Sequence, residues 1–321
     1  MLRTLGRVLR PAVFEERWHS NVYGVARSLL AIGTLGTLLA THASSIFRPA
    51  VGLPRYPLCN ATSRFGLFCL AGPDHLELAR WLAIAGLAVV ASGWRPRFTS
   101  LPHWYISWSF FTSGLLVDGG DQITANLALL LLPVALSDGR RLHWLGATSP
   151  PPGAEDHVPS AAMWIAARSF LVVIRLQIAG LYLQAAVSKM RVAEWRDGTA
   201  VYYWFTDPGF GLWEPIRTWA MPLLANGQVV AALTWSAMGI ETFLFAGLIA
   251  TPTARRVLLM FGILFHAAIA LVHGLPSFAF AMWAGLILFL RPPGEEFRLP
   301  KILWPRRWIS AYPMIFTRRS A

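Results

Sequence analysis

Long, mainly apolar stretches recur along this chain, and they approach or reach the roughly 20 residues that an α-helix needs to cross a bilayer. Six are clear, and a further pair is separated only by the turn Asp118-Gly119-Gly120-Asp121. The clear stretches are 22–41, 76–93, 161–189, 229–250, 257–272 and 275–290, and the pair is 101–117 and 122–137. They predict an all-α, polytopic transmembrane bundle of about eight spans. Because 122–137 is short, a re-entrant hairpin is the alternative there.

The composition supports the same class. Only 14% of the residues are charged and the mean hydropathy is +0.49. Soluble domains average about 25% charged residues. The sequence therefore predicts an integral membrane protein.

The net charge of +12 is distributed as a topology signal. With eight spans and a cytoplasmic N-terminus, the inner segments hold seventeen Lys and Arg residues and the outer segments seven. This asymmetry fits the positive-inside rule. It predicts that both termini lie in the cytoplasm and that the basic residues face the membrane surface rather than a nucleic acid.

The domain organisation follows from these assignments. Residues 1–20 mix Arg, Glu and aromatic side chains and suit an interfacial helix. Residues 21–291 form one multi-pass membrane domain, and residues 292–321 a basic cytoplasmic tail. Pro150-Pro151-Pro152-Gly153 marks a flexible connector within 142–160. In the outer segment, 190–228, many aromatics and Pro/Gly breaks predict re-entrant or interfacial helices.

Both cysteines, Cys59 and Cys69, fall in the first loop on the predicted outer side. That side is oxidising, so the two thiols could form a disulfide and close a small loop. Two free, buried thiols are the alternative.

Lys189 ends the stretch 161–189 and is one of only two lysines in the chain. The pKa of a lysine shifts readily when its amine is desolvated, whereas an arginine stays charged. Lys189 is therefore a candidate for an amine that must lose its proton. The simpler interpretation is a membrane anchor, with the stem in lipid and the ammonium among the headgroups.

Ionisable residues inside the predicted spans are costly to place there and mark functional sites. Arg168 and Arg175 are seven residues apart and share a helical face that must look into the bundle. Glu241 lies near the middle of its span. One hypothesis gathers these groups around an outward-facing polar cavity with Lys189 at its mouth. The other pairs Glu241 with Arg168 or Arg175, since buried charges are normally paired.

Two histidines, His266 and His273, lie seven residues apart in the predicted span 257–272 and just after it. His266 could form an acid/base pair with Glu241 in the cavity, which His273 would help to line. Alternatively, both histidines bond backbone carbonyls. Because this spacing lacks a third ligand, no metal site is predicted.

Asp118 and Asp121 flank the glycine turn at the predicted outer surface. In the simpler interpretation Asp121 is the N-cap of the following helix, and the glycines supply the tight turn. Alternatively, the two carboxylates pair with Arg191 or Arg196, or face the cavity.

Several stretches of the chain resemble a known group. The stretch Ala185-Ala186-Val187-Ser188-Lys189…Trp195-Arg196-Asp197-Gly198 is similar to the Lys…Trp-x-x-Gly stretch of the horizontally transferred transmembrane (HTTM) domain, the membrane half of vitamin K-dependent gamma-carboxylases. Phe265-His266-Ala267-Ala268 resembles its Phe-His element. The order of several segments resembles the bacterial sporulation-delaying protein B (SdpB) family over about residues 17–291. These segments are Asn21–Arg27, Cys59…Cys69, Glu77–Trp81, Ser92–Arg97 and Val117–Gln122.

This resemblance implies a protein of the bacterial plasma membrane that assists maturation or export of a secreted peptide toxin. Its partners would be the peptide precursor and a small accessory protein of the same operon type. By the carboxylase likeness, Lys189 matches a base that acts toward a quinone, with Trp195 and Gly198 supporting it. Carboxylation itself is not carried over, because Ser188 precedes a single lysine where the carboxylases have adjacent lysines.

Two functions therefore remain open. In the first, Lys189, Glu241 and His266 carry out chemistry on a peptide at an outward-facing cavity. In the second, the protein is a non-catalytic transporter or an immunity-type binding protein, and the same groups only stabilise a polar pore.

Overall fold

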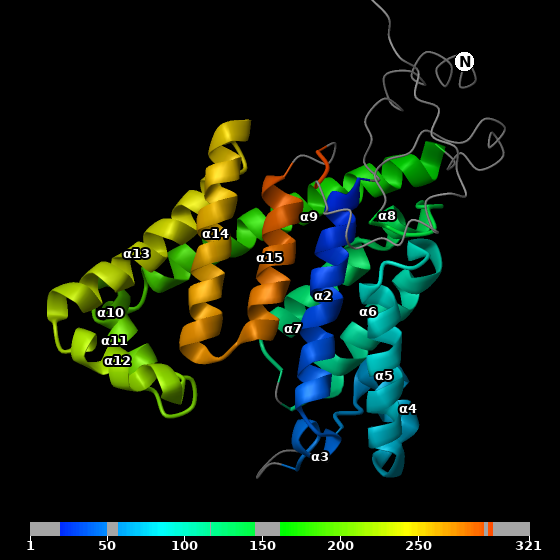
Figure 1. The fold of residues 1–321 in the computed structure, drawn as a ribbon, viewed down its shortest axis with the longest axis horizontal. Coiled ribbons are helices and arrows are strands. Elements are labelled where there is room, and N and C mark those ends of the chain that lie inside the picture. The colour runs from blue at the N-terminus through cyan, green and yellow to red at the C-terminus, as the bar shows by residue number, and fades with distance from the viewer. Residues whose placement is uncertain (1–19, 50–56, 116, 145–160, 292–294, 298–321) are drawn as a thin grey trace, which may run out of the picture.

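The computed structural model describes residues 20–49, 57–115, 117–144, 161–291 and 295–297 (Figure 1). This part of the chain is helical throughout and contains no strand, apart from one isolated bridge between Trp94 and Leu142. The predicted all-α class is thus confirmed. The interfacial helix expected at 1–20, most of the connector at 142–160 and nearly all of the basic tail at 292–321 lie outside the described residues.

The longer helices coincide with the predicted apolar stretches. They are α2 (Asn21–Ala40), α5 (Leu76–Ala91), α6 (Pro96–Ser113), α7 (Gly119–Leu130), α9 (Ala161–Lys189), α13 (Gly227–Ala246), α14 (Pro252–His273) and α15 (Pro276–Leu290). Short elements join them: α3 (Ala43–Ile46), η1 (Ala61–Phe65), α4 (Leu67–Ala71), η2 (Pro73–His75), α8 (Leu132–Leu136), α10 (Ala193–Arg196), α11 (Ala200–Thr206) and α12 (Glu214–Leu224).

Local signals explain where these helices begin and end. The Asn226 side chain accepts the backbone N–H groups of Gln228 and Val229 and caps α13. Proline lacks a backbone N–H, and it suits the first helical turn because the N–H groups there have no acceptor within the helix. Pro252 and Pro276 begin α14 and α15 in this way. After α14, Gly274 adopts a φ of +68°, a left-handed conformation that ends the helix at low steric cost.

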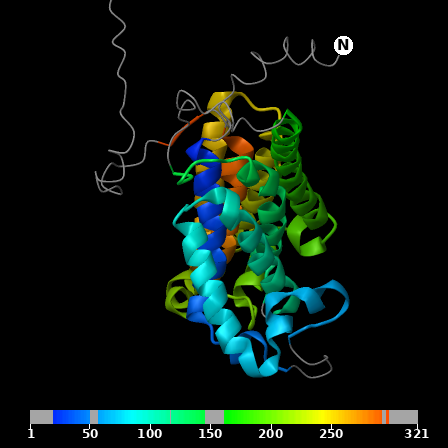
Figure 2. The ribbon, with the colours of Figure 1, turned by 90° about the vertical axis from the view of Figure 1, so that its right-hand side faces the viewer.

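The long helices run back and forth and form one bundle (Figures 1 and 2). In Figure 1, α2 and α15 stand side by side at the centre, α5 and α6 lie on one side, and α13 and α14 on the other. The long helix α9 crosses obliquely behind them and packs against α13 and α15. The short helices α3, α4 and α10–α12 all lie toward the lower end of this view.

The centre of the core is α15, which packs against α2, α14, α7 and α9. It is apolar all round, as expected of a helix that other helices surround. Glycines let its neighbours approach closely. A Cβ on Gly285 of α15 would lie 2.8 Å from Ile178 of α9, and one on Gly262 of α14 would lie 2.8 Å from Leu286. Small residues are the usual means of close helix packing in membranes.

Four of the described helices are long and apolar enough to cross a membrane. They are Asn21–Ala40, Ile165–Lys189, Gly227–Ala246 and Pro252–His273, and Pro276–Leu290 is a shorter apolar helix. These helices indicate a membrane protein. The count of eight spans and the re-entrant character of the outer segment remain predictions, because α5, α6 and α7 are shorter or more polar.

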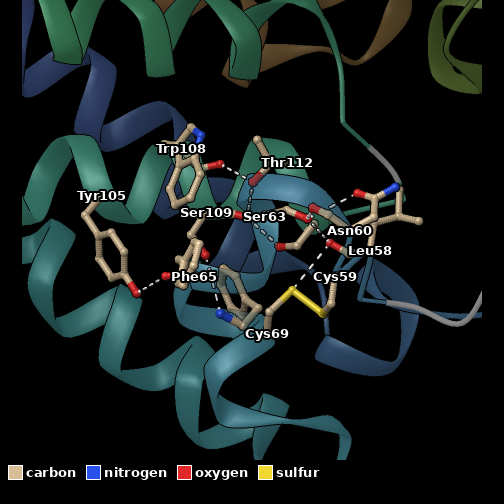
Figure 3. Close-up of a disulfide and its surroundings, with 12 residues drawn as sticks. Leu58, Cys59, Asn60, Ser63, Phe65, Cys69, Tyr105, Trp108, Ser109 and Thr112 are labelled. Carbon is tan, nitrogen blue, oxygen red and sulfur yellow. Dashed lines mark hydrogen bonds between the residues drawn. A yellow bond between two sulfur atoms is a disulfide. The ribbon is translucent and has the colours of Figure 1, made fainter.

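Near the lower end of the bundle, Cys59 and Cys69 are joined by a disulfide with a Cα–Cα distance of 5.6 Å (Figure 3). Ser63 organises the loop between them by donating its hydroxyl to the backbone oxygens of Leu58 and Asn60, both at 2.7 Å. The Leu58 N–H in turn donates to Ser113 O at the end of α6, 3.1 Å away. The disulfide-closed loop is therefore fastened to the bundle.

Buried polar groups also tie the start of α2 to its neighbours. Arg27, only 1% exposed, donates to Thr99 Oγ1 at 2.8 Å and lies 3.4 Å from His143 Nδ1. His143 Nε2 lies 2.9 Å from Ser28 Oγ, which donates to Ala91 O. Because the Arg27 guanidinium can only donate, His143 must accept at Nδ1 and donate from Nε2. This cluster joins α2, α5 and α6 to the segment after α8.

Candidate functional site

The last turn of α9 carries an ion pair with α13. Lys189 Nζ lies 2.6 Å from Glu241 Oε1 and 2.8 Å from Oε2, so one ammonium contacts both carboxylate oxygens. The Glu241 side chain is 9% exposed and that of Lys189 is 22% exposed. The pair is therefore largely removed from solvent, with the amine on its more accessible side.

Directly after α9 the chain turns back over this ion pair. Lys189 Nζ lies 5.1 Å from the centre of the Trp195 ring, within range of a cation–π interaction. The next residue, Arg196, accepts a hydrogen bond at its carbonyl from Trp235 Nε1 of α13, at 3.2 Å. The ammonium thus contacts both a carboxylate of α13 and an aromatic ring of the outer segment. The Trp235–Arg196 hydrogen bond holds this segment onto α13.

Gly198 completes the Trp-x-x-Gly stretch for two steric reasons. Its φ is +80°, a backbone conformation that residues with a Cβ adopt only at a steric cost. A Cβ there would also lie 3.0 Å from Ala231 Cβ and 3.2 Å from the Trp235 ring. The glycine therefore lets the segment after α10 turn sharply against α13, which keeps Trp195 beside Lys189.

A second polar pair joins α9 to α14. Tyr182 is seven residues before Lys189 and shares its helical face, and its hydroxyl lies 2.9 Å from His266 Nε2. The two residues are 1% and 2% exposed. Within the described part of the chain, His266 Nδ1 is buried without a hydrogen-bond partner. A buried, unpartnered nitrogen is unusual in a native protein and marks a position with unused hydrogen-bonding capacity.

This arrangement changes the pairings expected from the sequence. Glu241 bonds Lys189, and His266 bonds Tyr182, so no hydrogen bond joins Glu241 to His266 among the residues described. The proposed pairing of Glu241 with Arg168 or Arg175 is wrong. Arg175 lies fourteen residues before Lys189, about 21 Å along the helix, and its Nε donates to Phe289 O of α15 at 3.1 Å. Arg168 lies two further turns away, so neither arginine joins this site.

His273 has a different neighbourhood from His266. At the end of α14, His273 Nδ1 lies 2.6 Å from Phe210 O, and its ring packs against Phe205 at 5.5 Å between centres. The backbone N–H of Trp213 also donates to Val272 O at 2.7 Å. Here the expected carbonyl contact is present. His273 therefore fastens the outer segment to α14 instead of lining a cavity with His266.

Asp118 and Asp121 cap α7, but with roles other than those predicted. Asp118 is the N-cap and accepts from Gly120 N and Asp121 N at 2.7 and 3.2 Å, while Asp121 accepts the Asp118 N–H at 3.0 Å. The assignment of Asp121 as N-cap is wrong, because the reciprocal capping box uses both carboxylates. A Cβ on Gly120 would lie 2.7 Å from Phe278 Cα, and the Phe278 ring packs on His266. The turn therefore packs against Phe278, which in turn contacts His266.

Sequence reasoning missed two residues that complete the site. One is Tyr182, and its seven-residue spacing from Lys189 could have shown that the two residues share a helical face. The other is Thr234, fully buried on α13 and seven residues before Glu241. Its hydroxyl accepts the Val201 N–H at 3.2 Å and thereby caps the start of α11. No sequence pattern reveals that contact, since its partners are 33 residues apart.

The site can therefore offer an amine and a carboxylate beside the outer segment, and a phenol and an imidazole two turns back along α9. Each bonded pair contains a group that can give a proton and a group that can accept one, the components of general acid–base chemistry. Among the described residues, no three His, Cys, Asp or Glu side chains gather closely enough to hold a metal ion.

Comparison with known proteins gives two relatives of nearly full length, both from Bacillus subtilis (strain 168). The chain is 37% identical over 301 residues to the uncharacterized protein YitO, covering 92% of this chain and 94% of that protein. It is also 37% identical over 274 residues to the sporulation-delaying protein SdpB, covering 85% of this chain and 81% of SdpB. No protein-family model and no solved structure matches the chain.

Proposed function

The chain belongs to the family of the sporulation-delaying protein SdpB, and on that premise we propose that it assists maturation or export of a secreted peptide toxin. In this proposal it acts in the membrane on a peptide precursor, together with a small accessory protein. The chemistry takes place at the outer end of α9, where Lys189, Glu241 and His266 are the candidate reactive groups.

The observation that carries this proposal is the position of Lys189. Its amine contacts both oxygens of a mostly buried carboxylate, while 22% of its side chain remains exposed. An anchoring lysine would extend to the headgroups and would need no buried carboxylate. A reactive amine needs a neighbour that can exchange a proton with it and an open side for a substrate. Lys189 has both.

The proposed orientation places this site outside the cell, where an exported precursor would meet it. The support is the charge asymmetry of the sequence, with seventeen basic residues on the predicted inner side and seven on the outer side. Reporter fusions test the orientation. A fusion after Arg256 is expected to read as cytoplasmic and an insertion near Asn60 as external, and an external reading at Arg256 would contradict it.

Mass spectrometry of the secreted peptide tests the function itself. A candidate peptide precursor would be expressed in cells with and without this protein and analysed in the medium and in the cell fraction. We expect the mature form to be lost from the medium when the protein is absent, with unprocessed precursor in the cells. An unchanged mature peptide in the medium would contradict the proposal.

A non-catalytic role as a transporter or immunity-type binding protein is the second candidate. The observation that favours it is that the two polar pairs connect α9 with α13 and α14, as purely structural contacts would. Mass spectrometry of the peptide also separates these two candidate functions. In a binding role, the peptide made without this protein has the mature mass, and only its location or its toxicity to the producing cell changes.

A further inference from the structure

Four side-chain amides lie along neighbouring faces of α7 and α9. Gln122 and Asn126 are one turn apart on α7, and Gln177 and Gln184 are two turns apart on α9. Gln122, Asn126 and Gln184 are exposed and Gln177 is partly exposed. The two helices pack against each other along the edge of the bundle (Figure 2). They therefore present a single stripe of amides, here named the amide face.

No amide on this face has a hydrogen-bond partner within the described part of the chain. This is costly for Gln177 and Gln184, because α9 is long and apolar enough to cross the membrane over Ile165–Lys189 and lipid tails offer neither donors nor acceptors. Polar side chains on membrane helices therefore usually bond across to another helix. The other polar groups near α9, such as Lys189 and Tyr182, already have such partners.

The surface between the two helices is hollowed. A groove of about 440 Å³ runs between α7 and α9. Its lining consists of Asn126, Leu129, Leu130, Val173, Leu176 and Gln177. Next to it, Gly180 is exposed between Gln177 and Gln184, and a Cβ there would meet nothing within 4 Å. A glycine on the outer side of a membrane helix lets a second backbone approach closely.

We propose that the amide face is the interface through which two copies of this chain associate in the membrane. An amide carries both a donor and an acceptor, so this face can satisfy itself across a two-fold axis, where each patch meets its own copy. The groove residues and the four amides include no Asp, Glu, Lys or Arg, so like charges do not oppose the pairing.

The membrane fixes the symmetry of such a pair. Both copies have the same orientation in the bilayer, so the two-fold axis lies along the membrane normal and the two α9 helices run parallel. Residues near the axis then face their own counterparts. Gly180 is expected to be one of them, since it lies between the two glutamines and offers the closest approach.

Site-directed disulfide formation tests this arrangement. The two native cysteines are already bonded to each other, so Gly180→Cys adds the one reactive thiol. The matched control is Leu264→Cys, on an exposed position of α14. Gly180 lies nine residues from the end of α9, and Leu264 lies nine residues from the end of α14, so both lie at similar depth. In native membranes under mild oxidation, we expect a covalent dimer for Gly180→Cys and none for Leu264→Cys.

A second measurement uses variants without new cysteines. Gln177→Leu combined with Gln184→Leu removes the α9 amides but keeps an apolar helix that should insert normally. Energy transfer between labelled copies in liposomes is expected to show self-association about tenfold weaker or more, because each bond between membrane helices contributes modestly and each copy loses two. Retained wild-type association would overturn the proposal. So would equal crosslinking of both cysteine variants, or a crosslinked product containing a different protein.

Discussion

Replacing Lys189 with arginine is expected to abolish maturation of the peptide while leaving the abundance of the protein unchanged. The guanidinium of arginine can bond both oxygens of Glu241, as the lysine ammonium does at 2.6 and 2.8 Å. The contact between α9 and α13 is therefore kept. An arginine stays protonated in proteins, however, so it cannot supply a neutral amine. The comparison separates a structural cation from a reactive amine.

The readout is the mass of the secreted peptide together with the amount of protein in the membrane. Arg191→Lys is the matched control, because it makes the reverse exchange two residues away on an exposed side chain. It is expected to leave both quantities unchanged. Normal maturation by Lys189→Arg would show that Lys189 acts only as a cation and not as a reactive amine.

Removing the Lys189 charge altogether is expected to have the largest effect on stability. In Lys189→Met the apolar stem is kept, but Glu241, whose side chain is only 9% exposed, loses its ionic partner. Removing one member of a buried ion pair typically costs about 3–5 kcal/mol, because the remaining charge is left desolvated. Thermal unfolding in detergent should show a correspondingly lower midpoint, as should the yield of folded protein.

The double variant Lys189→Met, Glu241→Met checks the physical cause. With both charges replaced by apolar side chains of similar length, most of the lost stability should return, since buried ion pairs often contribute little relative to apolar packing. Maturation is expected to stay absent in the double variant. If the double variant were as unstable as Lys189→Met, the loss would come from packing around Lys189 and not from an unpaired Glu241.

The positions of the helices could be predicted largely from the sequence. The apolar stretches at 22–41 and 257–272, for example, reappear as α2 and α14 with shifts of a few residues. Hydrophobicity, helix caps and proline are local signals, so they act within a few residues of the positions they mark. The scarcity of lysine also identified Lys189 as exceptional without any structure.

The partners of the polar groups were decided only by the tertiary structure. From the sequence, Glu241 could have met Arg168 or Arg175, and His266 could have met Glu241. The packing of α9 against α13 instead joins Lys189 to Glu241 across 52 residues, and His266 contacts Tyr182 across 84. Periodicity gives the face on which a residue lies, but the level at which two helices meet depends on the close packing of all their side chains. The sequence therefore determined the helices and the residue of interest, and only the packed bundle determined what that residue contacts.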